Sequence, residues 1–212
     1  MNSTLAHHSR DEPRRVLAIG AHPDDVELGC GGTLIKHRDR GDALMILTLS
    51  CGARGGEAAM RRQESQQAAD RLGATLTLHD FEDAAITDGP ESIATIEAAI
   101  HAFRPTHVYT HSREDTHQDH RAVHTATLVA ARRVPHVYAY QSPSSTVEFR
   151  PQMFVDISAQ MHEKIELIKL HATQVGRRAN IEAELIRATA RYWGRYAGHV
   201  LAEPMMILRY CA

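Results

Sequence analysis

The sequence predicts an α/β fold that is Rossmann-like, with a mostly parallel central sheet and helices on both of its faces. Short apolar segments alternate with helical patterns along nearly the whole chain, which is typical of βαβ units. Residues 43–49 form a continuous, mostly apolar run, as expected of a strand buried on both faces. The length of 212 residues suits one domain. We expect a flexible polar leader at residues 1–15 and a single domain at residues 16–212.

Strands are expected in the first half of the chain at residues 16–21, 43–49 and 75–78. A glycine-rich turn at residues 29–33 leads into a helix that ends near Arg40, because Gly41 is a typical residue after a helix. A second helix, at residues 57–72, is rich in Ala, Glu, Gln and Arg and is stopped by Gly73.

Strands are expected in the second half at residues 107–110, 136–140, 153–157 and 205–210. The helix expected at residues 91–103 carries a stripe of isoleucines and stops before Pro105. Further helices are expected at residues 119–132, 159–171 and 181–196. The longest loop, at residues 141–151, suits either a substrate-facing loop or a plain connector.

The composition excludes several function classes. A net charge of −2 gives no reason to expect nucleic acid or an anionic membrane as a partner. The three cysteines form no C-x-x-C pair, so we expect no disulfide framework, and a cytoplasmic location. No segment resembles a signal peptide, and no apolar run approaches the length of about 18 residues that a membrane span needs. The unusual figure is 15 histidines, since histidine is the commonest metal ligand.

The first predicted strand runs into the stretch A-H-P-D-D-V-E-L-G-C-G-G-T at residues 21–33. In open α/β sheets, sites are built at the carboxyl ends of the strands. His22 and Asp25 lie three residues apart on a sharp turn, so an imidazole nitrogen and a carboxylate oxygen can face the same ion. Zn²⁺ accepts that mixture of ligands.

A second group of histidines and aspartates follows the fourth predicted strand, at residues 115–124. Because strands one and four can lie side by side, a histidine from this group would complete a set of two His and one Asp. Such a set leaves a coordination position open for water. His117, His120 and His124 are all candidates by spacing, and position favours His120 at the start of a helix.

The other polar residues of these groups suggest catalytic roles. Asp24 is a candidate general base for the metal-bound water, although Asp is also a favoured helix cap. His117 is expected to stabilise an oxyanion or, if charged, to protonate a leaving amine, with Asp119 holding it charged and oriented. Arg54, in a glycine-rich loop at the same sheet edge, is either a substrate-binding residue or a solvated one.

The glycines do not indicate a nucleotide site. Leu34 occupies the place of the third glycine of G-x-G-x-x-G, and no acidic residue ends the second strand. Walker A, G-x-S-x-G and zinc deaminase patterns are also missing. The residues therefore favour a metal-dependent hydrolase centred on His22, Asp24 and Asp25.

The first motif, together with the later H-x-D-H at residues 117–120, resembles the PIG-L (LmbE-like) family of zinc-dependent N-acetylglucosaminyl de-N-acetylases. Further similarity lies in R-R-Q-E at residues 61–64, Y-Q-S-P-S-S at 140–145, F-V-D-I at 154–157, and H-A-T-Q at 171–174 with Lys164 before it. The resemblance covers nearly the whole chain after the leader. One departure is Gln118, where the family usually has proline.

The resemblance implies a Rossmann-like fold and one Zn²⁺ per chain, although another divalent metal such as Fe²⁺ is possible. It implies that His22, Asp25 and His120 are the metal ligands, that Asp24 is the general base, and that His117 stabilises the oxyanion or acts as an acid. It further implies Asp119 as the acidic partner of His117 and, more loosely, Arg54 as a substrate contact. The implied reaction is removal of an acetyl group from the amine of an N-acetylated sugar or sugar-containing small molecule, and trimers or hexamers are possible.

The sequence also allows two alternative hypotheses besides the metal-dependent hydrolase. A set of two His and one carboxylate also suits a non-heme Fe(II) enzyme. The third reading is a non-catalytic protein that binds a metal or a sugar on the same fold. Fold and site together do not identify the substrate.

Overall fold

The computed structural model describes residues 13–175 and 181–211. Most of the leader that the sequence suggested, residues 1–12, lies outside the described residues. At its end, the prediction is wrong for Arg15, which is the first residue of strand β1. The backbone N–H of Arg14 donates to Asp42 and that of Arg15 to Thr106, so the chain is already held against its neighbours before the first strand.

The described strands form one seven-stranded sheet in the order β3-β2-β1-β4-β5-β7-β6. The strands are β1 (Arg15–Gly20), β2 (Ala43–Thr48), β3 (Thr75–Leu78), β4 (His107–His111), β5 (His136–Tyr140), β6 (Met153–Asp156) and β7 (Ala202–Tyr210). The first five strands pair in parallel, and β7 pairs in antiparallel fashion with both β5 and β6. This confirms the expected α/β fold with a mostly parallel sheet.

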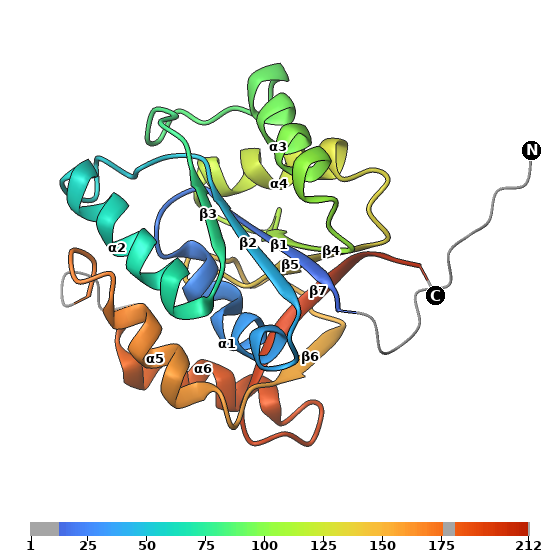
Figure 1. Cartoon of the computed structure of the whole chain (residues 1–212). Coiled ribbons are helices and arrows are strands. Elements are labelled where there is room, and N and C mark those ends of the chain that lie inside the picture. The colour runs from blue at the N-terminus through green and yellow to red at the C-terminus, as the bar shows by residue number, and fades with distance from the viewer. Residues whose placement is uncertain (1–12, 176–180, 212) are drawn as a thin grey trace, which may run out of the picture.

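Six helices cover the two faces of this sheet in the described ranges. They are α1 (Asp25–Asp39), α2 (Ala58–Leu72), α3 (Pro90–Phe103), α4 (Gln118–Ala130), α5 (Met161–Lys169) and α6 (Ala183–Gly194). Figure 1 shows α3 and α4 on one side of the sheet and α1, α2 and α5 on the other. Alternating residues of β1 serve the two sides: Val16 and Ala18 join the core under α1, whereas Leu17 and Ile19 join the core under α3 and α4.

The structure corrects the expected start of the first helix. Residues 29–33 are not a turn before this helix, because α1 already begins at Asp25 and the glycines lie inside it. The helix is kinked at Cys30, where φ is −141°. A Cβ atom on Gly29 would overlap the ring of Tyr140, and one on Gly32 would lie 2.8 Å from Ile157. These glycines therefore serve close packing of α1 against the sheet.

The carboxyl ends of β1 and β4 lie side by side in the middle of the sheet. These strands pair in parallel with Val16 opposite His107. β2 and β3 extend the sheet on one side of this pair, and β5 extends it on the other. The chain order thus reverses between β1 and β4, which is the place where open α/β sheets form their ligand crevices.

In the described part of the chain, no helix is long and apolar enough to cross a membrane.

Candidate metal centre

The turn between β1 and α1 is tightly constrained. Asp24, just before the helix, has a left-handed backbone conformation with φ of 87°, which is uncommon for a residue with a side chain. The backbone N–H of His22 donates to Oδ2 of Asp25 at 2.7 Å. The guanidinium of Arg61 donates to the carbonyl of Pro23 at 2.7 Å. These contacts hold an otherwise unfavourable conformation, as is common at functional sites.

His22 is held by carboxylates on one side of its ring. Its Nε2 atom lies 3.0 Å from Oδ2 of Asp119 and 3.2 Å from Oδ1 of Asp83. Its Nδ1 atom lies on the side of Asp25, 3.6 Å from Oδ2. In the neutral ring, a proton on Nε2 satisfies the two outer carboxylates and leaves the lone pair of Nδ1 for the centre of the site.

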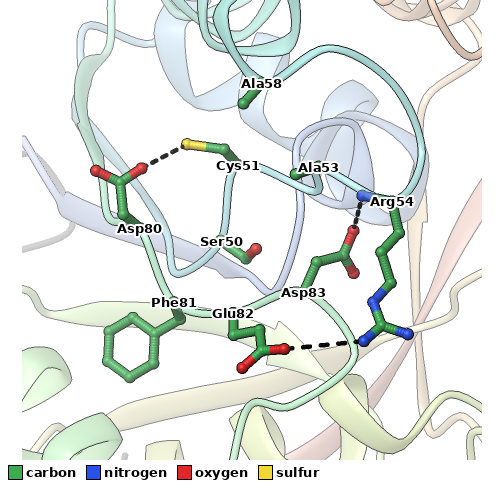
Figure 2. A pocket seen from close by; sticks show the side chains of 9 residues that line it. All are labelled: Ser50, Cys51, Ala53, Arg54, Ala58, Asp80, Phe81, Glu82 and Asp83. Carbon is green, nitrogen blue, oxygen red and sulfur yellow. Dashed lines mark hydrogen bonds and ion pairs between the residues drawn. The ribbon is translucent and has the colours of Figure 1, made fainter.

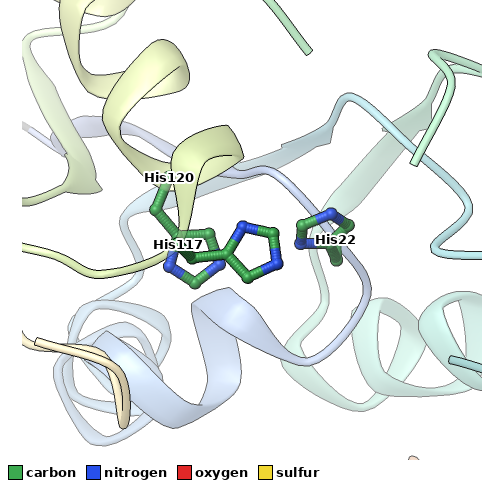
Figure 3. Close-up of side chains that lie close together, drawn as sticks. All are labelled: His22, His117 and His120. Atoms are coloured by element: carbon green, nitrogen blue, oxygen red, sulfur yellow. The ribbon is translucent and has the colours of Figure 1, made fainter. Parts of the chain in front are cut away.

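His120 repeats this arrangement from the other strand end. Its Nδ1 atom lies 3.0 Å from Oδ2 of Asp115, and its Nε2 atom lies 3.3 Å from Oδ1 of Asp25. Figure 3 shows His120, in the first turn of α4, and His117, just before that helix, close to His22. The ring centroids of His22 and His120 are 5.7 Å apart. The sequence-predicted set of His22, Asp25 and His120 is therefore brought together.

The charges around these histidines favour a cation. Burial lowers the pKa of His22, but hydrogen bonds to Asp119, Asp25 and Asp83 outweigh it and raise this pKa well above its ordinary value. Burial also acts against His120, yet Asp25 and Asp115 raise its pKa to about 9. The carboxylates thus stabilise positive charge where imidazole nitrogens face Asp25. Two imidazoles and one carboxylate are a donor set that suits Zn²⁺ or Fe²⁺.

His111 is a third histidine near Asp25, and it was not singled out by sequence. It is fully buried, and its Nε2 atom lies 3.1 Å from Oδ2 of Asp25. Together with Asp25 and His120 it forms one of the groups of described residues that could hold a metal; the others are His22 with His117 and His120, and His22 with Asp83 and Asp119. The backbone N–H of Ala21 donates to the same Nε2 atom at 3.0 Å, which occupies the lone pair that a metal would need. Burial and the neighbouring His120 lower the pKa of His111 to about 4, so His111 is a neutral support of the turn.

Asp24 is a buried carboxylate with an altered acidity. Burial and the charge of Asp25 raise its pKa to about 6, against the opposing effects of His171 and Arg61. Nη2 of Arg61 lies 3.4 Å from Oδ1 of Asp24. A carboxyl whose pKa lies near neutrality can both accept and return a proton.

His117 lies at the edge of the site as the residue before α4. Its Nδ1 atom accepts the backbone N–H of Asp119 at 3.3 Å. Burial and the nearby His120 lower the pKa of His117. Its neutral form therefore carries the proton on Nε2 and can donate a hydrogen bond from there.

The structure places Asp119 on a different histidine from the one that the sequence suggested. Its carboxylate bonds to the ring of His22 and accepts the backbone N–H groups of Ala84 and Ile86. Its link to the ring of His117 runs through the backbone N–H alone. Asp119 lies at the site, and its carboxylate contacts His22, while its charge also acts to raise the pKa of His117; its role toward His117 stays a prediction.

Arg54 is set apart from the histidines. Its side chain is 67% exposed and lies 3.9 Å from Glu82, and its backbone N–H donates to Asp83. Figure 2 shows it at the rim of a cavity of about 260 Å³. Ser50, Cys51, Asp80 and Phe81 are among the other lining residues. Asp83 belongs both to this cavity and to the surroundings of His22.

The structure places four further residues around the predicted ones that the sequence patterns do not indicate: Arg61, Asp83, His111 and Asp115. Arg61 is 3% exposed and touches the turn at Asp24. It lies within the R-R-Q-E segment, so the resemblance contained a signal for it. For Asp115, the signal was its place two residues before His117.

Comparisons with known proteins agree with this geometry. The uncharacterized deacetylase YaiS of Escherichia coli (strain K12) is 34% identical over 172 residues, which are 77% of this chain and 93% of that protein. The diacetylchitobiose deacetylase of Thermococcus kodakarensis is 28% identical over an alignment that spans 91% of this chain and 82% of that protein. A relative with another activity is the 4-oxalmesaconate hydratase of Pseudomonas putida, at 26% identity over 76% of this chain and 74% of the hydratase.

The solved structures show the same fold. The crystal structure of the conserved protein TT1542 from Thermus thermophilus matches 94% of this chain and 96% of its own, with a TM-score of 0.82 and 28% identity. The model of the family described as PIG-L, GlcNAc-PI de-N-acetylase, matches residues 17–131, which is more than half of the chain. This protein therefore belongs to the PIG-L family, as its sequence motifs predict.

Proposed function

We propose that this protein is a zinc-dependent N-deacetylase that removes an acetyl group from an N-acetylated sugar or a sugar-containing small molecule. The observation that carries the proposal is the convergence of His22, Asp25 and His120, with Asp24 and His117 beside them. Membership of the PIG-L family and the deacetylases among its relatives support it.

His22, Asp25 and His120 are the residues that would hold the cation. When bound, such a cation lowers the pKa of a coordinated water to about 7 and polarises the amide carbonyl. Asp119 and Asp115 support the proposed role of the histidines, because each fixes one ring nitrogen and leaves the other for coordination. Zinc is our choice over iron because the reaction needs a Lewis acid and no redox step.

The proton steps are assigned to the chain's own groups. Asp24 accepts a proton from the attacking water and returns it to the leaving amine, for which a pKa of about 6 is well placed. His117 donates a hydrogen bond from Nε2 to the oxyanion, in its neutral form. Arg61 holds the turn that carries Asp24.

The part of the substrate beyond the acetamide is expected to extend toward the cavity that Asp83 shares with the site. Asp80, Glu82 and Asp83 give its lining carboxylates that suit sugar hydroxyl groups, and Arg54 lies at its rim. We propose Arg54 as a substrate contact at this rim. These acidic groups disfavour a substrate with several negative charges.

The deciding experiment is acetate release from a panel of N-acetylated glycosides and sugar nucleotides, assayed with added Zn²⁺ and with a chelator. We expect metal-dependent release from at least one sugar substrate, and release that is about 10²–10⁴-fold slower from the Asp24→Asn variant. The same protein is also assayed with an unsaturated dicarboxylic acid, because one relative is a hydratase. Hydration of that acid without acetate release from any sugar would overturn the proposal.

The same assays distinguish the two alternative hypotheses, an iron enzyme and a non-catalytic binding protein. Activity restored by Fe²⁺ but not by Zn²⁺ would replace zinc with iron. Sugar binding that is unchanged in Asp24→Asn, without turnover in either protein, would indicate a binding protein. The cytoplasmic location and a trimeric or hexameric assembly stay predictions.

A further inference from the structure

We propose that Asp115 is a positioning residue that fixes His117 and His120 through a single carboxylate. This inference rests on the proposed metal centre. Oδ2 of Asp115 lies 3.0 Å from Nδ1 of His120, and Oδ1 accepts the backbone N–H of His117 at 2.8 Å. Asp115 itself is buried, with 4% of its surface exposed. One side chain thus sets the ring of His120 and the backbone from which His117 projects.

The contact with His120 selects its protonation pattern. A carboxylate accepts hydrogen bonds and donates none, so Nδ1 of His120 must carry the proton. In the neutral ring, which is the form that binds a metal, the lone pair then lies on Nε2, the atom that faces Asp25. In zinc sites, a carboxylate behind a histidine ligand orients the ring and raises its basicity.

The hydrogen bonds made by the side chain of Asp115 require a carboxylate. Three donors point at its two oxygens: the ring of His120, the backbone of His117 and the hydroxyl of Ser142. An asparagine at this position has one acceptor oxygen and an NH₂ group, so it can satisfy only one side. Either the ring of His120 or the backbone of His117 would then face a donor instead of an acceptor.

The same carboxylate ties the site to the loop after β5. The backbone of Asp115 forms a bridge with Ser145, and the N–H of Thr116 donates to the carbonyl of Ser144. The hydroxyl of Ser142 bonds Oδ2 of Asp115, and Oγ of Ser144 lies 3.4 Å from Nδ1 of His120. The sequence suits this loop to either a substrate-facing or a connecting role, and these contacts give its first residues a supporting position behind His120.

A matched control lies at the opposite edge of the sheet. Asp42, just before β2, is also buried; its Oδ2 lies 2.6 Å from Nδ1 of His37, and its Oδ1 accepts the backbone N–H of Arg14 at 2.8 Å. It therefore makes the same pair of contacts as Asp115, far from the metal centre. Asp42→Asn and Asp115→Asn remove the same chemical feature, and a merely structural role predicts the same result for both.

The test measures metal affinity and activity separately in the full chain. Zn²⁺ affinity of the metal-free proteins is measured by competition with a chromophoric chelator, and coordination geometry by the visible spectrum of the Co²⁺ form. We expect Asp115→Asn to bind Zn²⁺ about 10–100-fold more weakly, with a changed Co²⁺ spectrum, while Asp42→Asn matches the wild type. At saturating Zn²⁺, Asp115→Asn should keep KM and lose kcat, because His117 is displaced as well.

Equal Zn²⁺ affinity in the wild type and Asp115→Asn would overturn the inference, whereas absence of Zn²⁺ binding in the wild type would instead overturn the proposed function. Unfolding midpoints in urea identify a variant that fails to fold. In that case Ser142→Ala decides, since it leaves the carboxylate and removes one hydrogen bond to it. We expect about 2–10-fold weaker Zn²⁺ binding in Ser142→Ala, and unchanged binding would contradict the proposal.

Discussion

Oδ2 of Asp119 lies 3.0 Å from Nε2 of His22, and this contact joins the helix after β4 to the turn after β1. The carboxylate of Asp119 is thus the hydrogen-bond partner of His22, a candidate metal ligand. The ring of His117 receives only the backbone N–H of Asp119. We predict that Asp119→Asn weakens Zn²⁺ binding by about 10–100-fold, because the carboxylate orients the ligand and holds its proton. Calorimetric titration of the metal-free protein measures this.

The interpretation from sequence alone makes the opposite prediction. If Asp119 acted on His117, Asp119→Asn would bind Zn²⁺ as tightly as the wild type and lose only turnover. The double variant with His117→Asn would then be no worse than Asp119→Asn alone.

Asp24→Asn should retain the metal and lose hydrolysis. The side chain keeps its size, but an amide cannot accept the proton of the water, so we expect kcat to fall by about 10²–10⁴-fold. Atomic absorption checks that the metal is retained, and acetate release from the same sample checks that hydrolysis is lost. Loss of the metal from Asp24→Asn would show that Asp24 is a ligand or holds the turn, rather than acting as the base.

The pH dependence of activity tests the state of His117. Nδ1 of His117 accepts a backbone N–H, and burial lowers its pKa, so it acts as a neutral donor. We predict that His117→Asn lowers kcat by about 10²–10³-fold and leaves both limbs of the pH–rate profile in place. Disappearance of the alkaline limb in this variant would identify His117 as the general acid.

We expect a buried histidine outside the site, His107, to contribute to the loss of folding stability at acidic pH. Burial and the neighbouring His136 lower the pKa of His107 to about 3. Between pH 6.5 and 3 the unfolded chain binds a proton at this position and the folded chain does not, so stability falls as the pH falls. From pH 7 to pH 5 the loss is about 2 kcal/mol.

Urea unfolding with a chelator present measures this loss at both pH values. His107→Gln should lose about 2 kcal/mol less than the wild type over the same interval, because it has no group to titrate. Parallel stability curves for the two proteins would contradict this assignment.

The fold was predictable because each of its signals is local. The apolar run at residues 43–49 and the glycines that stop α1 and α2 are readable without tertiary information. The start of α1 was not, since the glycines look like a turn and their helical placement depends on close contact with Tyr140 and Ile157. The length of β7 was also missed at its start, where Ala202 and Glu203 pair with β6.

The site was predictable where one short motif carries several groups, and less so where partners come from distant segments. His22, Asp24 and Asp25 share one turn. The carboxylate of Asp119 is 97 residues from His22 in sequence, so its partner could not be chosen by spacing. Spacing favours its neighbour His117 as the partner, but Asp119 presents its backbone N–H rather than its carboxylate to that ring.

The proposed zinc-dependent deacetylation is tested by the dependence of acetate release on added Zn²⁺, measured with metal-free protein and a sugar substrate identified from the panel. We expect no release from the metal-free protein and a rise that reaches a plateau at one Zn²⁺ per chain. Full acetate release from the metal-free protein in the presence of a chelator would contradict it.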